Sequence, residues 1–130
     1  MLTAWATQYG HPLVTALDPI PALSPDARYE LLASMREALE NIRRHTAGAP
    51  VRVSLRSDEE TGELVIADEG PGFDVRLVAQ REAEGHFGLR GMRERLQMIG
   101  GTSRWESVIG SGTTVTLRVP LTDLNLLPRI

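Results

Sequence analysis

Three short segments of this sequence carry side chains suited to binding a phosphorylated ligand. In the first, Glu37 and Asn41 are four residues apart, so on a helix they lie on one face, which Arg44 and His45 share at about 100° per residue. A carboxylate can accept a proton from an attacking hydroxyl or water, or orient it. An asparagine oxygen is a hard ligand suited to Mg²⁺, and an arginine can neutralise a phosphate. Taken alone, the face is explained as well by a solvated helix surface.

The second segment is Asp68-x-Gly70-x-Gly72, which directly follows an alternating apolar run. A carboxylate here can accept a hydrogen bond from an exocyclic amine such as that of adenine. The glycines let the backbone turn tightly and approach a planar ring. Asp, Gly and Pro are also the usual residues of an ordinary turn, so this segment is not specific by itself.

The third segment, residues 85–92, places Gly85, Gly88 and Gly91 at the start of a predicted helix. Amide N–H groups at a helix N-terminus are free to bind phosphate oxygens, and the helix dipole favours an anion there. The Gly-Lys-Ser/Thr ending of a Walker loop is missing. Glycines before a helix are weak evidence when considered alone.

The elements that must position these segments can be predicted from capping residues and apolar periodicity. Ser24 and Pro25 are typical of a helix start, and the helix should run to about residue 46. Its apolar stripe, which we expect to lie opposite the polar face, consists of Leu31, Leu32, Met35, Ala38, Leu39 and Ile42. Two alternating runs, 51–56 and 63–67, predict strands joined by a hairpin loop at 58–62, and the second strand leads into Asp68.

A further helix is predicted over about 88–99, followed by strands at about 102–108 and 113–119. Residues 2–9 are interpreted as the end of a helix and 12–17 as an edge strand. The order of elements predicts a two-layer α/β sandwich, in which a mixed sheet is packed on one face by about three helices. We expect a preceding helix or linker in 1–10, one domain in 11–121 and a C-terminal tail in 122–130.

Composition excludes several classes of function. The net charge of −3 and the 5% aromatic content argue against a nucleic-acid surface. The absence of cysteine removes disulfides and thiolate metal sites. No apolar run approaches the roughly 20 residues of a membrane span, so any membrane anchor of a parent protein is expected to lie outside this chain. The absence of cysteine is compatible with a cytoplasmic domain, which is the location we expect.

Together, in this order, the segments resemble the ATPase fold (Bergerat fold) shared by gyrase, heat-shock chaperone, histidine kinase and mismatch-repair proteins. The matching parts are residues 37–41 with His45 (the N box), 68–73 (the first glycine box), 88–96 (the second) and 112–114 with the strand ending at Pro120. The resemblance covers about residues 25–121. The Gly-Leu-Arg-Gly-Met-Arg-Glu-Arg form of the second box is most like sensor histidine kinases of the nitrate-sensor and lipid-desaturase-thermosensor class.

The resemblance implies a role for each matched residue. Glu37 would act as general base or orient the attacking group, Asn41 would hold Mg²⁺, and Arg44 would contact phosphate. Asp68 would accept from the adenine amine. The remaining implied nucleotide-binding residues are Gly70 and Gly72 in the purine pocket, Thr113 beside the carboxylate through water, and Gly85, Gly88, Leu89 and Gly91 around a lid over residues 74–87.

The function implied is that of the ATP- and Mg²⁺-binding catalytic domain of a two-component sensor histidine kinase. It would deliver the γ-phosphoryl group to a His on a dimerisation domain outside this chain, and a response regulator would receive it next. His45 lies inside the N box and is not expected to be the acceptor; Trp5 and Trp105 are interpreted as packing residues. The alternatives are a stand-alone serine protein kinase of the anti-sigma type and a nucleotide-sensing module without catalysis. We expect the isolated domain to be a monomer.

Overall fold

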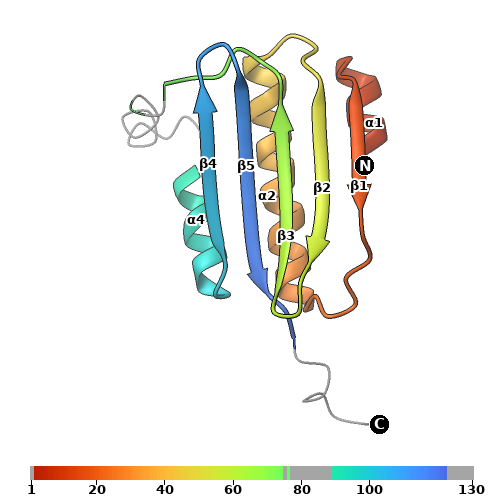
Figure 1. Cartoon of the computed structure of the whole chain (residues 1–130), viewed down its shortest axis with the longest axis vertical. Coiled ribbons are helices and arrows are strands. Elements are labelled where there is room, and N and C mark those ends of the chain that lie inside the picture. The colour runs from red at the N-terminus through yellow and green to blue at the C-terminus, as the bar shows by residue number, and fades with distance from the viewer. Residues whose placement is uncertain (1, 75, 77–88, 123–130) are drawn as a thin grey trace.

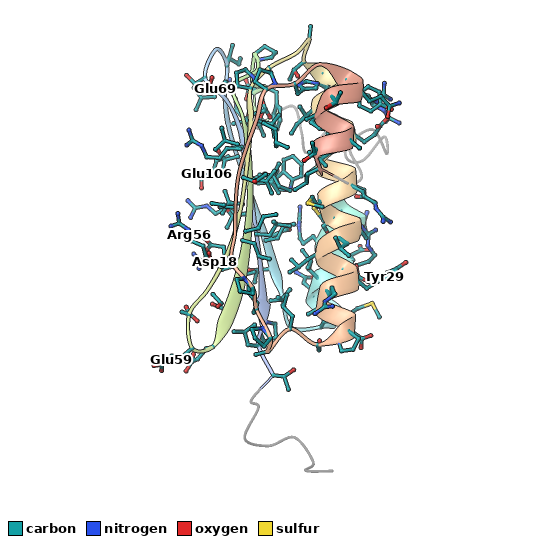
Figure 2. The ribbon with its side chains drawn as sticks, turned by 90° about the vertical axis from the view of Figure 1, so that its right-hand side faces the viewer. Asp18, Tyr29, Arg56, Glu59, Glu69 and Glu106 are labelled. Carbon is teal, nitrogen blue, oxygen red and sulfur yellow. The ribbon has the colours of Figure 1, made fainter. Side chains whose placement is uncertain are left out.

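The computed structural model describes residues 2–74, 76 and 89–122 as two layers, a sheet and a set of helices on one of its faces (Figures 1 and 2). The described helices are α1 (Leu2–Tyr9), α2 (Pro25–His45) and α4 (Leu89–Met98). The strands are β1 (Leu13–Leu17), β2 (Val51–Ser57), β3 (Thr61–Asp68), β4 (Thr102–Val108) and β5 (Gly112–Pro120). Their order in the sheet is β1-β2-β3-β5-β4. β1 runs parallel to β2, and the other neighbours are antiparallel. The predicted mixed-sheet sandwich is therefore confirmed.

Helix α2 begins and ends where its capping residues place it. The Ser24 side-chain oxygen accepts from the Ala27 amide at 3.1 Å, and Pro25 occupies the first turn, where its missing N–H costs nothing. At the other end, the Thr46 amide still donates to the Ile42 carbonyl at 2.9 Å. A 21-residue helix is about 32 Å long at 1.5 Å per residue, so α2 spans the whole length of the sheet. Its last turn consequently lies at the same end of the molecule as the carboxyl end of β3, the strand that Asp68 closes (Figure 1).

The core lies between α2, α4 and the inner face of the sheet. A Leu, Ile, Val or Met side chain that becomes fully buried contributes about 1.5–3 kcal/mol, so this layer dominates the favourable side of folding. Its most fully buried large side chains are Val53, Ile66, Met92, Leu96, Leu117 and Val119. Leu32, predicted as part of the α2 stripe, is instead 41% exposed and lines an open apolar hollow beside Leu17. Leu32 lies at the edge of the helical stripe, where apolar periodicity does not separate core from margin.

Helix α1 packs against the same layer. Leu2 and Trp5 contact the core, and the Trp5 ring stacks on His11 with centroids 4.8 Å apart. The buried His11 ring donates from Nδ1 to the Ala49 carbonyl at 2.8 Å. Residues 2–11 are thus fastened to the loop that follows α2. None of the helices within the described ranges is long and apolar enough to span a membrane.

The β2–β3 turn closes the far end of the sheet. The Asp58 carboxylate accepts from the amides of Glu60 and Thr61 at 2.8 and 2.7 Å, and these bonds lower the pKa of Asp58. The turn is shorter than predicted, because Gly62 pairs with Val119 inside β3 rather than lying in the loop. Glu59 in this turn and Glu69, just after β3, mark opposite ends of the sheet (Figure 2).

Candidate functional site

A pocket opens where the end of β3, the start of β5 and the last turns of α2 meet. Its empty volume is about 460 Å³, with the open solvent at its mouth included. The lining comes from α2 and its cap, the sheet, and the loop after β3: Ala38, Asn41, Ile42, His45, Thr46, Ile66, Asp68, Pro71, Gly72, Phe73, Trp105, Thr113 and Val115. Most of these side chains are apolar, with a few polar groups among them, which is the usual composition of a small-molecule site.

Asp68 is the acidic group of this pocket. Burial raises its pKa, while a hydrogen bond from the Gly70 amide, the nearby His11 and the Thr113 backbone act in the opposite direction. The Gly70 amide donates to Asp68 Oδ1 at 2.8 Å and fixes the carboxylate. An ionised carboxylate only accepts hydrogen bonds, so this position suits a ligand group that donates, such as an amine.

The glycines after Asp68 are required by close packing. A Cβ on Gly70 would overlap the Thr46 methyl group, and a Cβ on Gly72 would overlap the Val108 carbonyl oxygen. Gly72 also has a φ of +66°, in the left-handed region that favours glycine. The loop is held in this position by the β4–β5 hairpin, where the Gly110 amide donates to the Pro71 carbonyl at 2.6 Å.

The predicted polar face of α2 is divided by the structure. Asn41 and His45 line the pocket beside Ala38 and Ile42, so this part of the face adjoins the apolar stripe and does not lie opposite it. The reason is that Asn41 follows Ala38 by three residues, one helical turn away on the same side. Arg44 is exposed, lies outside the lining of the pocket, and has its Nε 3.2 Å from Glu40 Oε1.

Glu37, one turn before Asn41, faces α4 rather than the pocket wall. Its Oε1 accepts from Nη2 of Arg95 at 3.1 Å, and Arg95 Nε also donates to Glu30 Oε2 at 3.2 Å. The other carboxylate oxygen, Glu37 Oε2, is buried and has no hydrogen-bond partner among the described residues. One oxygen is therefore anchored to the helix that follows the glycine-rich segment, and the second is buried beside it.

The second glycine box is described in part. Gly91 lies in the first turn of α4, and a Cβ there would sit 3.4 Å from Arg95 Nη1, so the guanidinium packs close to the helix start. Leu89 begins the helix. Gly85 and Gly88, together with most of the predicted lid, lie outside the described residues.

Several residues in or beside the pocket were not assigned to a site by sequence reasoning. Trp105, interpreted as a packing residue, lines the pocket, and its indole nitrogen is buried. Within the described part of the chain, neither this nitrogen nor the Thr46 hydroxyl has a hydrogen-bond partner. Ser107 on β4 bonds to the Phe73 amide at 2.9 Å and to the Thr113 hydroxyl at 2.8 Å. Only the alternation of β4 hinted that these side chains face inward.

The side chains that could ligate a divalent cation are few. Within residues 2–74, 76 and 89–122 there is no group of three or more acidic or His side chains able to hold a metal by themselves. Asn41 lines the pocket, and the buried, unpartnered Glu37 Oε2 belongs to the preceding turn. Such a sparse set fits Mg²⁺, which usually keeps several waters and binds one or two protein groups plus ligand phosphates.

Comparison with known proteins agrees with this geometry. Residues 28–123 match the family model described as histidine kinase-, DNA gyrase B-, and HSP90-like ATPase. That match covers well over half of the chain, which therefore belongs to this ATPase family.

The individual relatives are bacterial kinases. The chain is 32% identical over 99 residues to the signal transduction histidine-protein kinase/phosphatase DegS of Bacillus subtilis, covering 76% of this chain and 26% of that protein. It is 33% identical over 100 residues to the sensor histidine kinase LiaS of the same organism, covering 77% and 27%. The chain thus spans about a quarter of the length of these relatives.

A solved structure supports the fold. The histidine kinase domain of the blue-light activated histidine kinase EL346 from Erythrobacter litoralis superposes with a TM-score of 0.75 at 20% identity, covering 92% of this chain and 57% of that one. At this level of identity the similarity concerns the fold alone.

Proposed function

We propose that this chain is the ATP-binding catalytic domain of a sensor histidine kinase. The observation that carries the proposal is Asp68, a half-buried acceptor that lines a mostly apolar pocket together with Asn41. The family membership and the kinase relatives support the same function. The subclass of nitrate sensors and lipid-desaturase thermosensors is part of the proposal and rests on the sequence of the second glycine box.

In this proposal the adenine ring enters between α2 and the loop after β3. Asp68 accepts a hydrogen bond from the exocyclic amine, and the absent side chains of Gly70 and Gly72 leave the backbone close to Thr46 and to the β4–β5 hairpin. The phosphates then extend toward α4, whose first turn carries Gly91 and whose dipole favours an anion. Arg44, exposed near the end of α2, is not needed to hold the adenine.

The chemistry proposed is transfer of the γ-phosphoryl group to an imidazole nitrogen of the dimerisation domain. The bond between phosphorus and the bridging oxygen breaks, a phosphorus–nitrogen bond forms, and ADP leaves. Asn41 would hold Mg²⁺, which when bound neutralises charge on the phosphate oxygens. Glu37, anchored through Oε1 by Arg95, would orient the attacking group or accept its proton with Oε2. Catalysis would come mainly from positioning.

The partners proposed are a phosphoacceptor and dimerisation domain of the same kinase, and then a response regulator. The parent protein is proposed to be membrane-bound with this domain on the cytoplasmic side. The isolated domain is proposed to be a monomer, because dimerisation is assigned to the acceptor helices.

The experiment is a phosphotransfer assay with γ-labelled ATP and Mg²⁺, with and without a purified dimerisation domain carrying the acceptor His. We expect label on the added domain only, at a rate that falls at least about tenfold in Glu37→Gln or Asn41→Ala. Stoichiometric label on His11, His45 or His86 of this chain would contradict the proposal. Label on a serine of a partner would indicate the anti-sigma type of kinase, and nucleotide binding without transfer to any acceptor would indicate a sensing module.

A further inference from the structure

A compact hydroxyl network lies beside Asp68, at the junction of the β4–β5 hairpin and the loop after β3. The Ser107 hydroxyl makes three hydrogen bonds: it contacts the Phe73 amide at 2.9 Å, the Gly112 carbonyl at 3.1 Å and the Thr113 hydroxyl at 2.8 Å. Thr113 lines the pocket and is the direct strand partner of Asp68 across β5 and β3.

The direction of each bond follows from counting hydrogens. An amide N–H can only donate and a carbonyl can only accept, while a serine hydroxyl has one hydrogen and two lone pairs. Phe73 therefore donates to Ser107, and the one Ser107 hydrogen goes to Gly112. For the third contact to be a hydrogen bond, Thr113 must donate to Ser107.

This assignment uses the only hydroxyl hydrogen of Thr113. Its oxygen can then offer nothing but lone pairs to the pocket, as does the ionised carboxylate of Asp68. Two adjacent acceptors favour an exocyclic amine, which has two hydrogens to donate. They disfavour a carbonyl oxygen at the same position, because its lone pairs would face theirs.

We infer that Ser107 is a specificity-determining positioning residue: by accepting from Thr113, it makes the pocket select a 6-amino purine over a 6-oxo purine. The inference rests on the proposed function, because it takes a purine nucleotide as the ligand. Ser107 does not touch the base in this account. It acts through the orientation of the Thr113 hydroxyl.

In Ser107→Ala the Thr113 hydroxyl is released and its hydrogen can rotate toward the pocket. The rotated hydroxyl can donate to a 6-oxo group, so discrimination should weaken. The test is the ratio of the dissociation constants for Mg·ITP and Mg·ATP, measured by titration calorimetry on the full chain. We expect Ser107→Ala to reduce this ratio about 3- to 10-fold, the effect of roughly one hydrogen bond. Ser111→Ala, at an exposed position of the same hairpin, should leave the ratio unchanged.

Two controls separate this role from a structural one. Loss of the Phe73 contact alone would weaken ATP and ITP equally, so an unchanged ratio in Ser107→Ala would overturn the inference. Thr113→Val removes the hydroxyl, and in that background Ser107→Ala should have no further effect on the ratio; a second, equal reduction would also overturn it. A wild-type chain that binds ATP tightly but has no preference over ITP would overturn the inference and leave the proposed function standing. A chain that binds neither nucleotide would overturn both.

Discussion

At the scale of single residues, Asp68 shows how a binding group lowers the stability of the fold that carries it. Burial raises the pKa of Asp68 above the ordinary value of 3.8. The folded protein therefore holds this proton more tightly than the unfolded chain does. As the pH rises above about 3.8, the unfolded chain loses the proton first, and the free energy of unfolding falls until the folded carboxyl has also ionised.

This linkage predicts that Asp68→Asn stabilises the protein at neutral pH. The amide cannot ionise, and its oxygen can still accept from the Gly70 amide. We expect a higher Tm than that of the wild type at pH 7 without nucleotide, and a difference that shrinks as the pH is lowered toward 4. Thermal unfolding followed by circular dichroism at several pH values measures it. A lower Tm at pH 7 would show that the charged form is favoured by the fold.

The glycine at position 72 gives a second prediction at this scale, and Gly10 provides a matched control. Their φ angles are similar, +66° and +71°, but a Cβ on Gly72 would overlap Val108, whereas a Cβ on Gly10 has nothing within 4 Å. Gly10→Ala should cost about 1–2 kcal/mol, the strain of the left-handed conformation. Gly72→Ala should cost clearly more in urea unfolding, because the hairpin carbonyl must also move. Equal costs would mean that the loop can leave the hairpin without penalty.

At the scale of elements, Arg95 connects α4 with α2. It donates to Glu30 and Glu37, which lie two turns apart on one face of α2. Helix α4 starts at the glycine-rich segment, where the phosphates are proposed to bind. The Arg95 contact therefore joins this end of the site to Glu37, the proposed general base. The same guanidinium packs near Gly91, where a Cβ would lie 3.4 Å from Arg95 Nη1.

The strength of this connection can be predicted from exposure. The side chains of Arg95 and Glu37 are 35% and 38% exposed, so solvent screens their attraction. A double-mutant cycle with Arg95→Met and Glu37→Gln should give a coupling energy of about 0.5–1 kcal/mol in urea unfolding. The Arg90–Glu94 pair within α4 is 77% and 60% exposed and should couple less, at about 0.3–0.5 kcal/mol. A coupling near zero for Arg95 and Glu37 would refute the link between the two helices.

The elements themselves are largely predictable from sequence. The Ser24 cap, the alternation of the strands and the glycines after Met98 predict each described helix and strand to within a few residues. Apolar periodicity does not predict which element packs against each face of a helix. Periodicity places Leu32 in the apolar stripe of α2 and Asn41 on its polar face. In the structure Leu32 is exposed and Asn41 lines a pocket. These outcomes depend on which elements pack against α2.

At the scale of the whole molecule, the site lies at one end of the sheet, where segments that are distant in sequence meet. Asn41, Asp68, Gly72 and Thr113, which the resemblance to an ATPase family assigns to one site, line one pocket, and their roles toward a nucleotide stay predictions. The Ser107–Phe73 and Arg95–Glu37 contacts were not predicted, because each joins residues that are more than 30 positions apart in sequence. Motifs report residue types at fixed spacing, whereas such contacts follow only from the completed fold.

The opposite end of the sheet supplies the control for the central claim. Asp58 caps the β2–β3 turn there, a full strand length from Asp68. Asp58→Asn and Asp68→Asn each remove one negative charge. A difference in ATP affinity between the two variants therefore reports a site at the Asp68 end of the sheet.

The decisive measurement is therefore a calorimetric titration of Mg·ATP into the wild-type chain and into the Asp68→Asn and Asp58→Asn variants. The account predicts saturable binding of one nucleotide per chain and at least about a tenfold weaker affinity in Asp68→Asn, since a hydrogen bond to a charged group contributes about 1.5–3 kcal/mol. It predicts an unchanged Kd in Asp58→Asn. Absence of saturable binding, or the same Kd in wild type and Asp68→Asn, would contradict the assignment of this pocket to ATP.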